Sequence, residues 1–126
     1  MYKVEDWTST ATTHLNICAI YSHLSKHQDA AEHAELAIQM LEKADPSTLK
    51  SSDNEKSYWN IKMLCYYNLA VELEHLKKFV LAKKNLELAR ETALKNEKKN
   101  ETMIKNIDQS IQRIEGEESD MKRKLS

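Results

Sequence analysis

Glycine and proline are almost missing from this sequence of 126 residues, which contains one of each where average usage would supply about fifteen together. Folds with many tight turns, such as β-sandwiches and doubly wound sheets, need residues that accept positive φ or fix a bend. The sequence therefore predicts an all-α fold of long helices with few connections. The same lack excludes glycine-rich phosphate loops and dinucleotide-binding fingerprints, which need several glycines close to a phosphate.

A strong net charge is also lacking. Lys+Arg total 19 and Asp+Glu total 20, so no global field attracts the protein to nucleic acid or to an anionic membrane. Residues 1–45 are mainly acidic and residues 77–105 mainly basic, but such runs at helical spacing are usually solvated faces. The basic strip has no interleaved aromatics, so we expect no nucleic-acid partner. If the strip binds a partner, we expect an acidic protein surface.

Cysteine is scarce and long apolar runs are absent. Cys18 and Cys65 lie far apart among apolar neighbours, which is typical of buried residues in a reducing compartment. No stretch approaches the roughly 18 apolar residues of a membrane span, and the polar residues 1–6 do not resemble a signal peptide. The sequence therefore predicts a soluble, intracellular, cytoplasmic protein with no membrane partner.

Breakers and apolar periodicity predict five helices, at about residues 9–25, 28–43, 54–76, 79–96 and 100–116. Ser9 or Thr10 can cap the first helix, and Pro46 stops the second. Ser51, Ser52 or Asp53 can cap the third. We expect one helical domain over residues 9–116, preceded by a segment at 1–8 and followed by a charged tail at 117–126 that frays.

Two segments of the sequence repeat one pattern at an offset of 52 residues. The first runs from Asn16 as Asn-Ile-Cys-Ala-Ile-Tyr-Ser-His-Leu, and the second runs from Asn68 as Asn-Leu-Ala-Val-Glu-Leu-Glu-His-Leu. The same offset places Ala30, Ala34 and Ala37 opposite Ala82, Leu86 and Ala89. Two related pairs of helices are therefore predicted.

This pattern resembles the tetratricopeptide repeat, which couples an apolar-small-x2-Tyr run on one helix to Ala-x3-aromatic on the next. The matching residues are Ile17, Cys18 and Tyr21, then Leu69, Ala70 and Leu73, and finally Phe79 with Ala82. The resemblance implies two antiparallel helix hairpins of an α-solenoid. Repeat one spans about 9–44, repeat two spans about 54–97, and a capping helix spans about 100–116. The family's usual period is 34 residues, so the longer offset here implies longer helices and the loop at 47–53.

In this family the first helix of each pair lines a concave face that holds ligands. The resemblance places on that face Thr12, Leu15, Asn16, Ala19, Ser22 and His23, followed by Leu64, Tyr67, Asn68, Val71, Glu74 and His75. Family members that grip a partner's C-terminal carboxylate use lysines and an arginine there, and none of these positions holds either residue. We therefore expect a partner peptide or helix held by apolar contact. Asn16 and Asn68 either bond its backbone or serve local packing only.

A second interpretation concerns the predicted fifth helix. Its seam of isoleucines has a 3-4-3 spacing and consists of Ile104, Ile107, Ile111 and Ile114. The seam covers the preceding helix pair, or it joins copies of an antiparallel bundle into a homo-oligomer. Both interpretations stay open at this point.

No group of residues predicts catalysis. His23, His27 and His33 lack the Cys or carboxylate partners of a familiar zinc site, and the paired carboxylates Glu72 and Glu74 lie in no predicted apolar pocket. We therefore expect no enzyme, no metal and no cofactor, but a scaffold or adaptor subunit of a larger assembly. The repeat style and the alanine-rich second helices suggest a cytoskeletal or ciliary complex.

Overall fold

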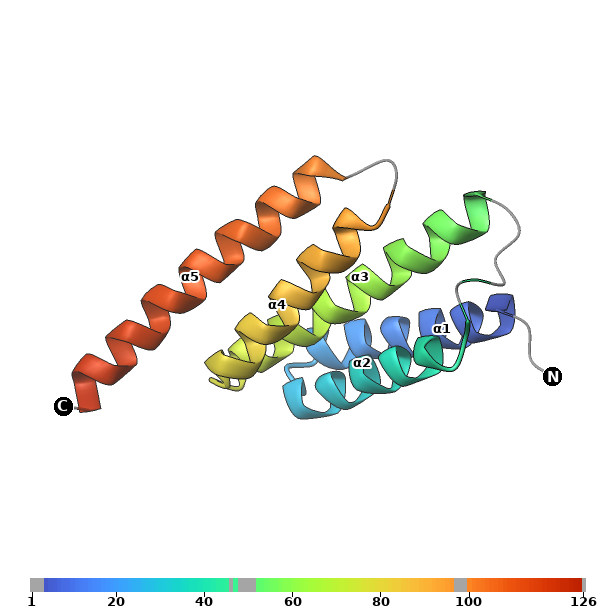
Figure 1. Ribbon diagram of the computed structural model, residues 1–126. Coiled ribbons are helices and arrows are strands. Elements are labelled where there is room, and N and C mark those ends of the chain that lie inside the picture. The colour runs from blue at the N-terminus through green and yellow to red at the C-terminus, as the bar shows by residue number, and fades with distance from the viewer. Residues whose placement is uncertain (1–3, 46, 48–51, 97–99, 126) are drawn as a thin grey trace.

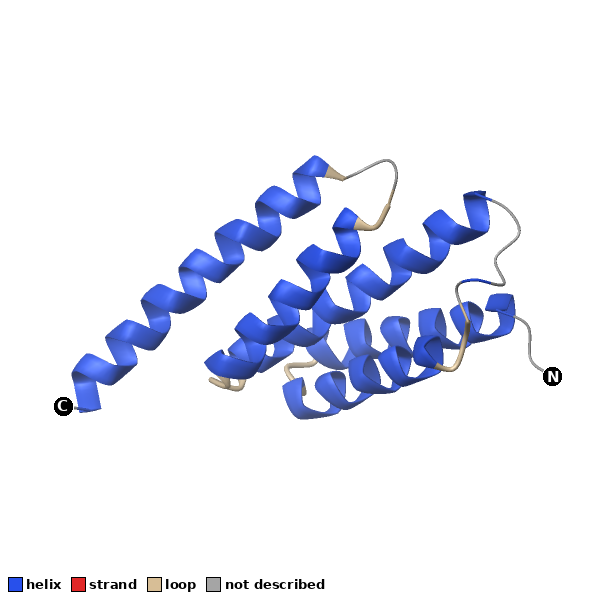
Figure 2. Ribbon diagram, viewed as in Figure 1, coloured by secondary structure: helices blue, strands red, loops and turns tan. Residues whose placement is uncertain are grey.

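The computed structural model describes residues 4–45, 47, 52–96 and 100–125. Within these ranges the chain forms five α-helices and no strand (Figure 1, Figure 2). They are α1 (Val4–His23), α2 (His27–Glu42), α3 (Ser52–His75), α4 (Phe79–Leu94) and α5 (Glu101–Leu125). The all-α prediction is confirmed. None of the described helices is long and apolar enough to cross a membrane.

The first and last helices are longer than predicted. α1 begins at Val4 rather than after Ser9 or Thr10, so residues 4–8 are helical. Trp7 lies 5.3 Å from the Lys43 ammonium at the end of α2, a tertiary contact that offsets the modest helix propensity of the Ser/Thr run.

The C-terminal helix α5 continues through Gly116 to Leu125, over the tail that was expected to fray. The basic side chains of Lys122, Arg123 and Lys124 lie in its last turn, where positive charge interacts favourably with the helix dipole. Pro46, Ser51 and residues 97–99 lie outside the described residues, as do the side chains of Ser52 and Asp53. The predicted helix stop and caps at these positions therefore stay predictions.

Consecutive helices run antiparallel, and each packs on the next, from α1 on α2 to α4 on α5 (Figure 1). α1 also contacts α3. The turns that join α1 to α2 and α3 to α4 follow the same backbone path, 52 residues apart. Their corresponding features are the positive φ of Ser25 (60°) and Lys77 (62°), and the amides of Lys26 and Lys78, which donate to the carbonyls of Tyr21 (2.8 Å) and Leu73 (2.9 Å).

A tryptophan–lysine contact also recurs at this offset. The Trp59 ring lies 4.9 Å from the Lys95 ammonium, just as Trp7 lies beside Lys43. Each contact joins the N-terminal part of one helix to the residue that follows the next helix. The repeated pattern therefore extends beyond the residues in which the sequence showed it.

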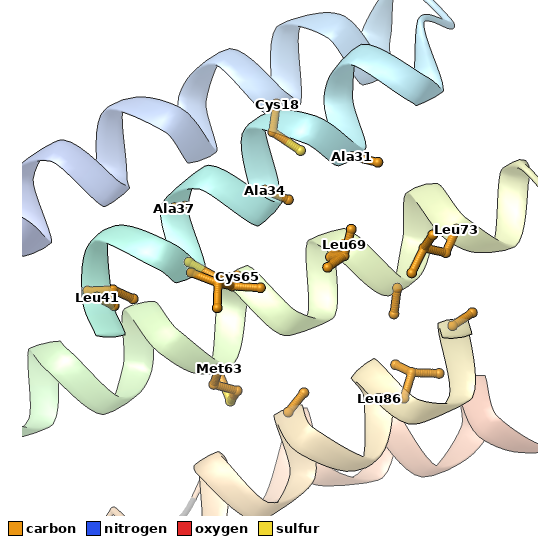
Figure 3. Close-up of a cluster of buried hydrophobic side chains, with 14 of the residues drawn as sticks. Cys18, Ala31, Ala34, Ala37, Leu41, Met63, Cys65, Leu69, Leu73 and Leu86 are labelled. Carbon is orange, nitrogen blue, oxygen red and sulfur yellow. The ribbon is translucent and has the colours of Figure 1, made fainter. Parts of the chain in front are cut away.

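The core between α2 and α3 combines small side chains with larger ones. Ala34 and Ala37 of α2 are fully buried, and they lie near Cys65 and Leu69 of α3 (Figure 3). Small side chains let two helix backbones approach closely, so the larger side chains of the facing helix fill the remaining space. The Tyr58 hydroxyl donates to the Leu41 carbonyl at 3.1 Å and ties the other end of α3 to α2.

The two cysteine thiols should be unreactive in the folded protein. Burial, with a contribution from Glu72, raises the pKa of Cys18 to about 11, and burial raises the pKa of Cys65 to about 12, from an ordinary 9.0. Near pH 8 the reactive thiolate is then scarcer than in the unfolded chain, by about a hundredfold for Cys18 and about a thousandfold for Cys65. We expect iodoacetamide to label the native protein more slowly than the urea-unfolded protein by at least these factors. Equal rates in a mass-spectrometric time course would contradict the burial.

Candidate partner-binding face

The predicted concave residues of α1 and α3 meet in a cleft between these two helices. Ala19, Ser22 and His23 line it from α1, and Asn68 and Val71 line it from α3. The cleft has a volume of about 470 Å³ and is open to solvent. The structure therefore brings together predicted site residues from both halves of the repeat.

A second cleft lies between α3 and α5, with a volume of about 440 Å³. Val71, Glu74 and His75 line it from α3, and Arg113 and Glu117 line it from α5. Because Val71 lines both clefts, they are neighbours along one face. We call this face, formed by α1, α3 and α5 around the two clefts, the groove.

The two clefts are built from corresponding positions. Ala19, Ser22 and His23 stand 52 residues before Val71, Glu74 and His75, so α3 contributes to the second cleft what α1 contributes to the first. The opposite walls differ: Asn68 and Glu72 of α3 line the first cleft, and Arg113 and Glu117 of α5 line the second. α5 therefore faces α3 across the second cleft, as α3 faces α1 across the first.

The other predicted groove residues line neither of these two clefts. Thr12 and Asn16 are exposed, and the Thr12 hydroxyl donates to the Thr8 carbonyl of its own helix at 2.8 Å. Leu15, Leu64 and Tyr67 are partly buried and pack against the core. The structure therefore places none of these five residues in either cleft.

Several residues that line the clefts were missed by the sequence reasoning, namely Cys18, Glu72, Lys77, Arg113 and Glu117. Glu72 is 2% exposed, a burial that the sequence analysis did not predict. Its counterpart in the first repeat is Ile20, a variable position, so the pattern carried no signal for its burial. Arg113 and Glu117 belong to a helix that lacks the residue types of the repeat, so the repeat carried no signal for them.

The electrostatics of the second cleft are governed by Glu74. Arg113 donates to both of its carboxylate oxygens, from Nη2 to Oε1 at 2.8 Å and from Nε to Oε2 at 3.0 Å. These bonds lower the pKa of Glu74 and raise that of Arg113, while burial and the neighbouring Glu74 raise the pKa of Glu117. The arginine charge is therefore already matched by a carboxylate of this chain.

A buried contact between a histidine and a glutamate lies beside the first cleft and joins the two hairpins. His27 Nδ1, at the start of α2, lies 2.6 Å from Glu72 Oε2 on α3, and the two side chains are 21% and 3% exposed. The ring of His27 also stacks on that of His75, with centroids 4.1 Å apart. Glu72 is thus held by a histidine of the neighbouring hairpin, and the nearby Cys18 thiol stays protonated. This arrangement supports packing of the hairpins rather than nucleophilic chemistry.

A second histidine contact should make stability depend on pH. His14 Nδ1 and His33 Nδ1 are 3.1 Å apart, so one ring must donate and the other accept. Burial and the proximity of His33 lower the pKa of His14 from 6.5. His14 therefore binds a proton more readily in the unfolded chain than in the folded protein. The contribution of neutral His14 to the free energy of unfolding is complete above pH 6.5 and is lost as the pH falls towards the lowered pKa of the folded protein.

We expect urea midpoints measured between about pH 7.5 and 5 to fall less for His14→Gln than for the parent protein, because the variant removes this proton linkage. Comparison of the two proteins cancels the contributions of the histidines that do not contact His14. Identical pH dependence in both would contradict the assignment.

The isoleucine seam packs inside the chain. Ile107 and Ile114 are 0% and 1% exposed, and Ile104 and Ile111 are partly buried. Two ion pairs between α4 and α5 accompany the seam, Arg90 with Asp108 at 3.0 Å and Lys83 with Glu118 at 2.8 Å. Self-association through the buried isoleucines would first require release of α5.

The ion pairs of Arg90 and Lys83 also bear on the basic strip at residues 77–105. They show that two cations of this strip already have acidic partners within the protein.

Comparison of this chain with protein-family models, with curated proteins and with solved structures gave no match. The likeness to the tetratricopeptide repeat therefore depends on the repeated residues of the sequence. The function must be inferred from the geometry of the groove and of its two clefts.

Proposed function

We propose that this chain is a non-enzymatic protein interaction module that binds a peptide or helix of a partner protein in the groove. Its role would be that of a scaffold or adaptor subunit in a larger assembly. The observation that carries the proposal is the pair of corresponding clefts, which share Val71 and follow one another along α1, α3 and α5. A face that repeats in this way suits a ligand whose backbone also repeats.

We further propose that the chain is a short helical array of the tetratricopeptide type. Support comes from the two turns with matching backbone geometry and from the tryptophan–lysine contacts at the same offset. On this interpretation α5 is the first helix of a third, incomplete unit and caps the second hairpin. Such arrays bind partners on extended concave surfaces.

The chemistry of the first cleft favours main-chain recognition with apolar contact. Ala19 and Val71 offer apolar surface, whereas the Asn68 side chain can both donate and accept hydrogen bonds. Among the described residues, Asn68 makes no side-chain hydrogen bond within the protein. It is therefore available to a peptide group of the ligand.

Peptide selection with groove variants tests the proposal. Peptides selected from a random display library on the full chain should lose at least tenfold in affinity for Val71→Glu, which places a charge between both clefts. Asn68→Ala should weaken them about threefold to tenfold, as expected for one hydrogen bond of about 1 kcal/mol. Fluorescence anisotropy measures both effects.

Gln109→Glu, at an exposed position of α5 outside the two clefts, is the matched control and should leave the peptide affinity unchanged. The proposal fails if no peptide is selected, or if the peptides bind Val71→Glu as tightly as the parent protein.

A further inference from the structure

From residue 8 onward, the helix α1 has no charged side chain, although the protein as a whole is highly charged. Residues 8–24 contain no Asp, Glu, Lys or Arg, although these types make up 31% of the sequence. Ile20 and Leu24 are 60% and 59% exposed, and Ile17 is partly exposed. Thr13 is exposed as well, and its hydroxyl already donates to the Ser9 carbonyl at 3.1 Å. We call Thr13, Ile17, Ile20 and Leu24 the α1 end face.

The second hairpin shows what packs on such a face. The residues of α3 that correspond to Thr13, Ile17 and Ile20 at the 52-residue offset are Cys65, Leu69 and Glu72, and their exposures are 0%, 5% and 2%. The neighbouring helix α2 covers this side of α3, with His27 bound to Glu72 and Cys65 lying between the two helices (Figure 3). Among the described residues, no helix of this chain packs on the corresponding positions of α1.

The C-terminal helix α5, at the opposite end of the five helices, has a more polar outer surface. The outward residues of α5 are polar and exposed, and they include Gln109, Gln112, Glu115, Ser119 and Lys122. Terminal helices of repeat arrays carry a polar outer face, because nothing packs on them. Protein interfaces, in contrast, are depleted in charged residues at their centres. The C-terminal end of this array therefore has the composition of a free surface, and the α1 end face has the composition of an interface.

We infer that the α1 end face binds an amphipathic α-helix of a partner protein, packed on α1 as α2 packs on α3. The contact stripe of that helix would carry small apolar residues, as α2 does with Ala31, Ala34 and Ala37. It would present an apolar side chain where α2 presents His27, because Ile20 stands where α3 has Glu72. A second copy of this chain offers no such helix, since the corresponding sides of α2 and α4 are covered by α3 and α5.

This site is separate from the groove. Ala19, Ser22 and His23 face the first cleft, whereas Ile20 and Leu24 do not line it. Failure of one proposal therefore leaves the other intact.

A constrained peptide with the sequence of α2 tests the inference. The probe is residues 27–42 with His27→Leu, held helical by lactam bridges from Gln28→Lys to Glu32 and from Gln39→Lys to Glu35, all four being exposed positions in α2. In fluorescence anisotropy it should bind the full chain saturably. The double variant Ile20→Asp, Leu24→Asp should weaken binding at least tenfold without lowering the melting temperature, because both side chains are already largely exposed. A probe that keeps His27 should bind less tightly.

Two control variants define the site further. Val80→Asp adds the same charge at a 70% exposed apolar position of α4, and Val71→Glu alters the groove; both should leave probe binding unchanged. No binding to the parent chain, or equal binding to the Ile20→Asp, Leu24→Asp variant, overturns the inference. It is also overturned if the parent chain forms dimers, or binds phosphatidylcholine vesicles, in a way that this variant abolishes. Those results would assign the face to a second copy or to a lipid surface.

Discussion

Replacing His27 with alanine should destabilise the protein by about 3 kcal/mol or more, because it leaves the Glu72 carboxylate buried without its partner. Glu72 is almost completely buried and its contact with His27 is 2.6 Å long, so the substitution removes the protein group that holds the carboxylate. Urea unfolding at neutral pH, followed by circular dichroism, measures the loss. A loss below about 1 kcal/mol would contradict the structural role of this pair.

The matched control replaces both partners by apolar residues. Phe79 occupies the position of His27 in the second hairpin, so His27→Phe combined with Glu72→Leu imitates a packing arrangement that the chain already uses. Apolar replacement of a whole buried ion pair is often neutral or stabilising. We expect the double variant to be within about 1 kcal/mol of the parent protein or more stable. A double variant as unstable as His27→Ala would show that the loss came from the shape of the site and not from the unpaired charge.

Replacing Ile107 with aspartate should release α5, at a cost of about 4 kcal/mol or more for that interface. Ile107 is 0% exposed, so an aspartate there must either be buried without a partner or separate α5 from α4. Hydrogen exchange followed by mass spectrometry should then show loss of protection in residues 101–125 while α1 and α2 remain protected. Ile104→Asp is the control, because Ile104 is only partly buried and should keep α5 in place.

The consequence for the groove is specific. Release of α5 removes Arg113 and Glu117 from the second cleft and leaves the first cleft, between α1 and α3, intact. Peptides that span both clefts should therefore bind Ile107→Asp more weakly, and peptides that fill only the first cleft should bind it unchanged. Unchanged protection of α5 in the variant would contradict the assignment of Ile107 to this interface.

The sequence predicted the middle of the fold better than its two ends. α2 and α4 begin and end within two residues of their predicted bounds, because the small-residue periodicity runs through both segments and polar, helix-breaking residues follow each of them. The start of α1 depends instead on Trp7, whose lysine contact comes from the end of another helix. The length of α5 depends on contacts of its tail with α4, such as that of Glu118 with Lys83. Such tertiary contacts leave no local signal.

The residues of the candidate site were likewise predicted only in part. Residues such as Ala19 and Val71 were predictable, because the repeat fixes which side of each first helix faces inward. Glu72 was not predictable as a buried residue, because its partner His27 lies 45 positions away and on another helix. Arg113 and Glu117 were missed because α5 lacks the residue types of the repeat.

The central claim is that this protein binds its partner in the groove, and nuclear magnetic resonance tests it most directly. A selected peptide titrated into the isotope-labelled full chain should shift the backbone resonances of Ala19, Ser22, Asn68, Val71 and Glu74 and the methyl resonances of Ala19 and Val71. The shifts should follow the binding curve. Shifts confined to the outer surface of α4, around Val80 and Leu81, would contradict the claim, because those exposed side chains lie outside both clefts.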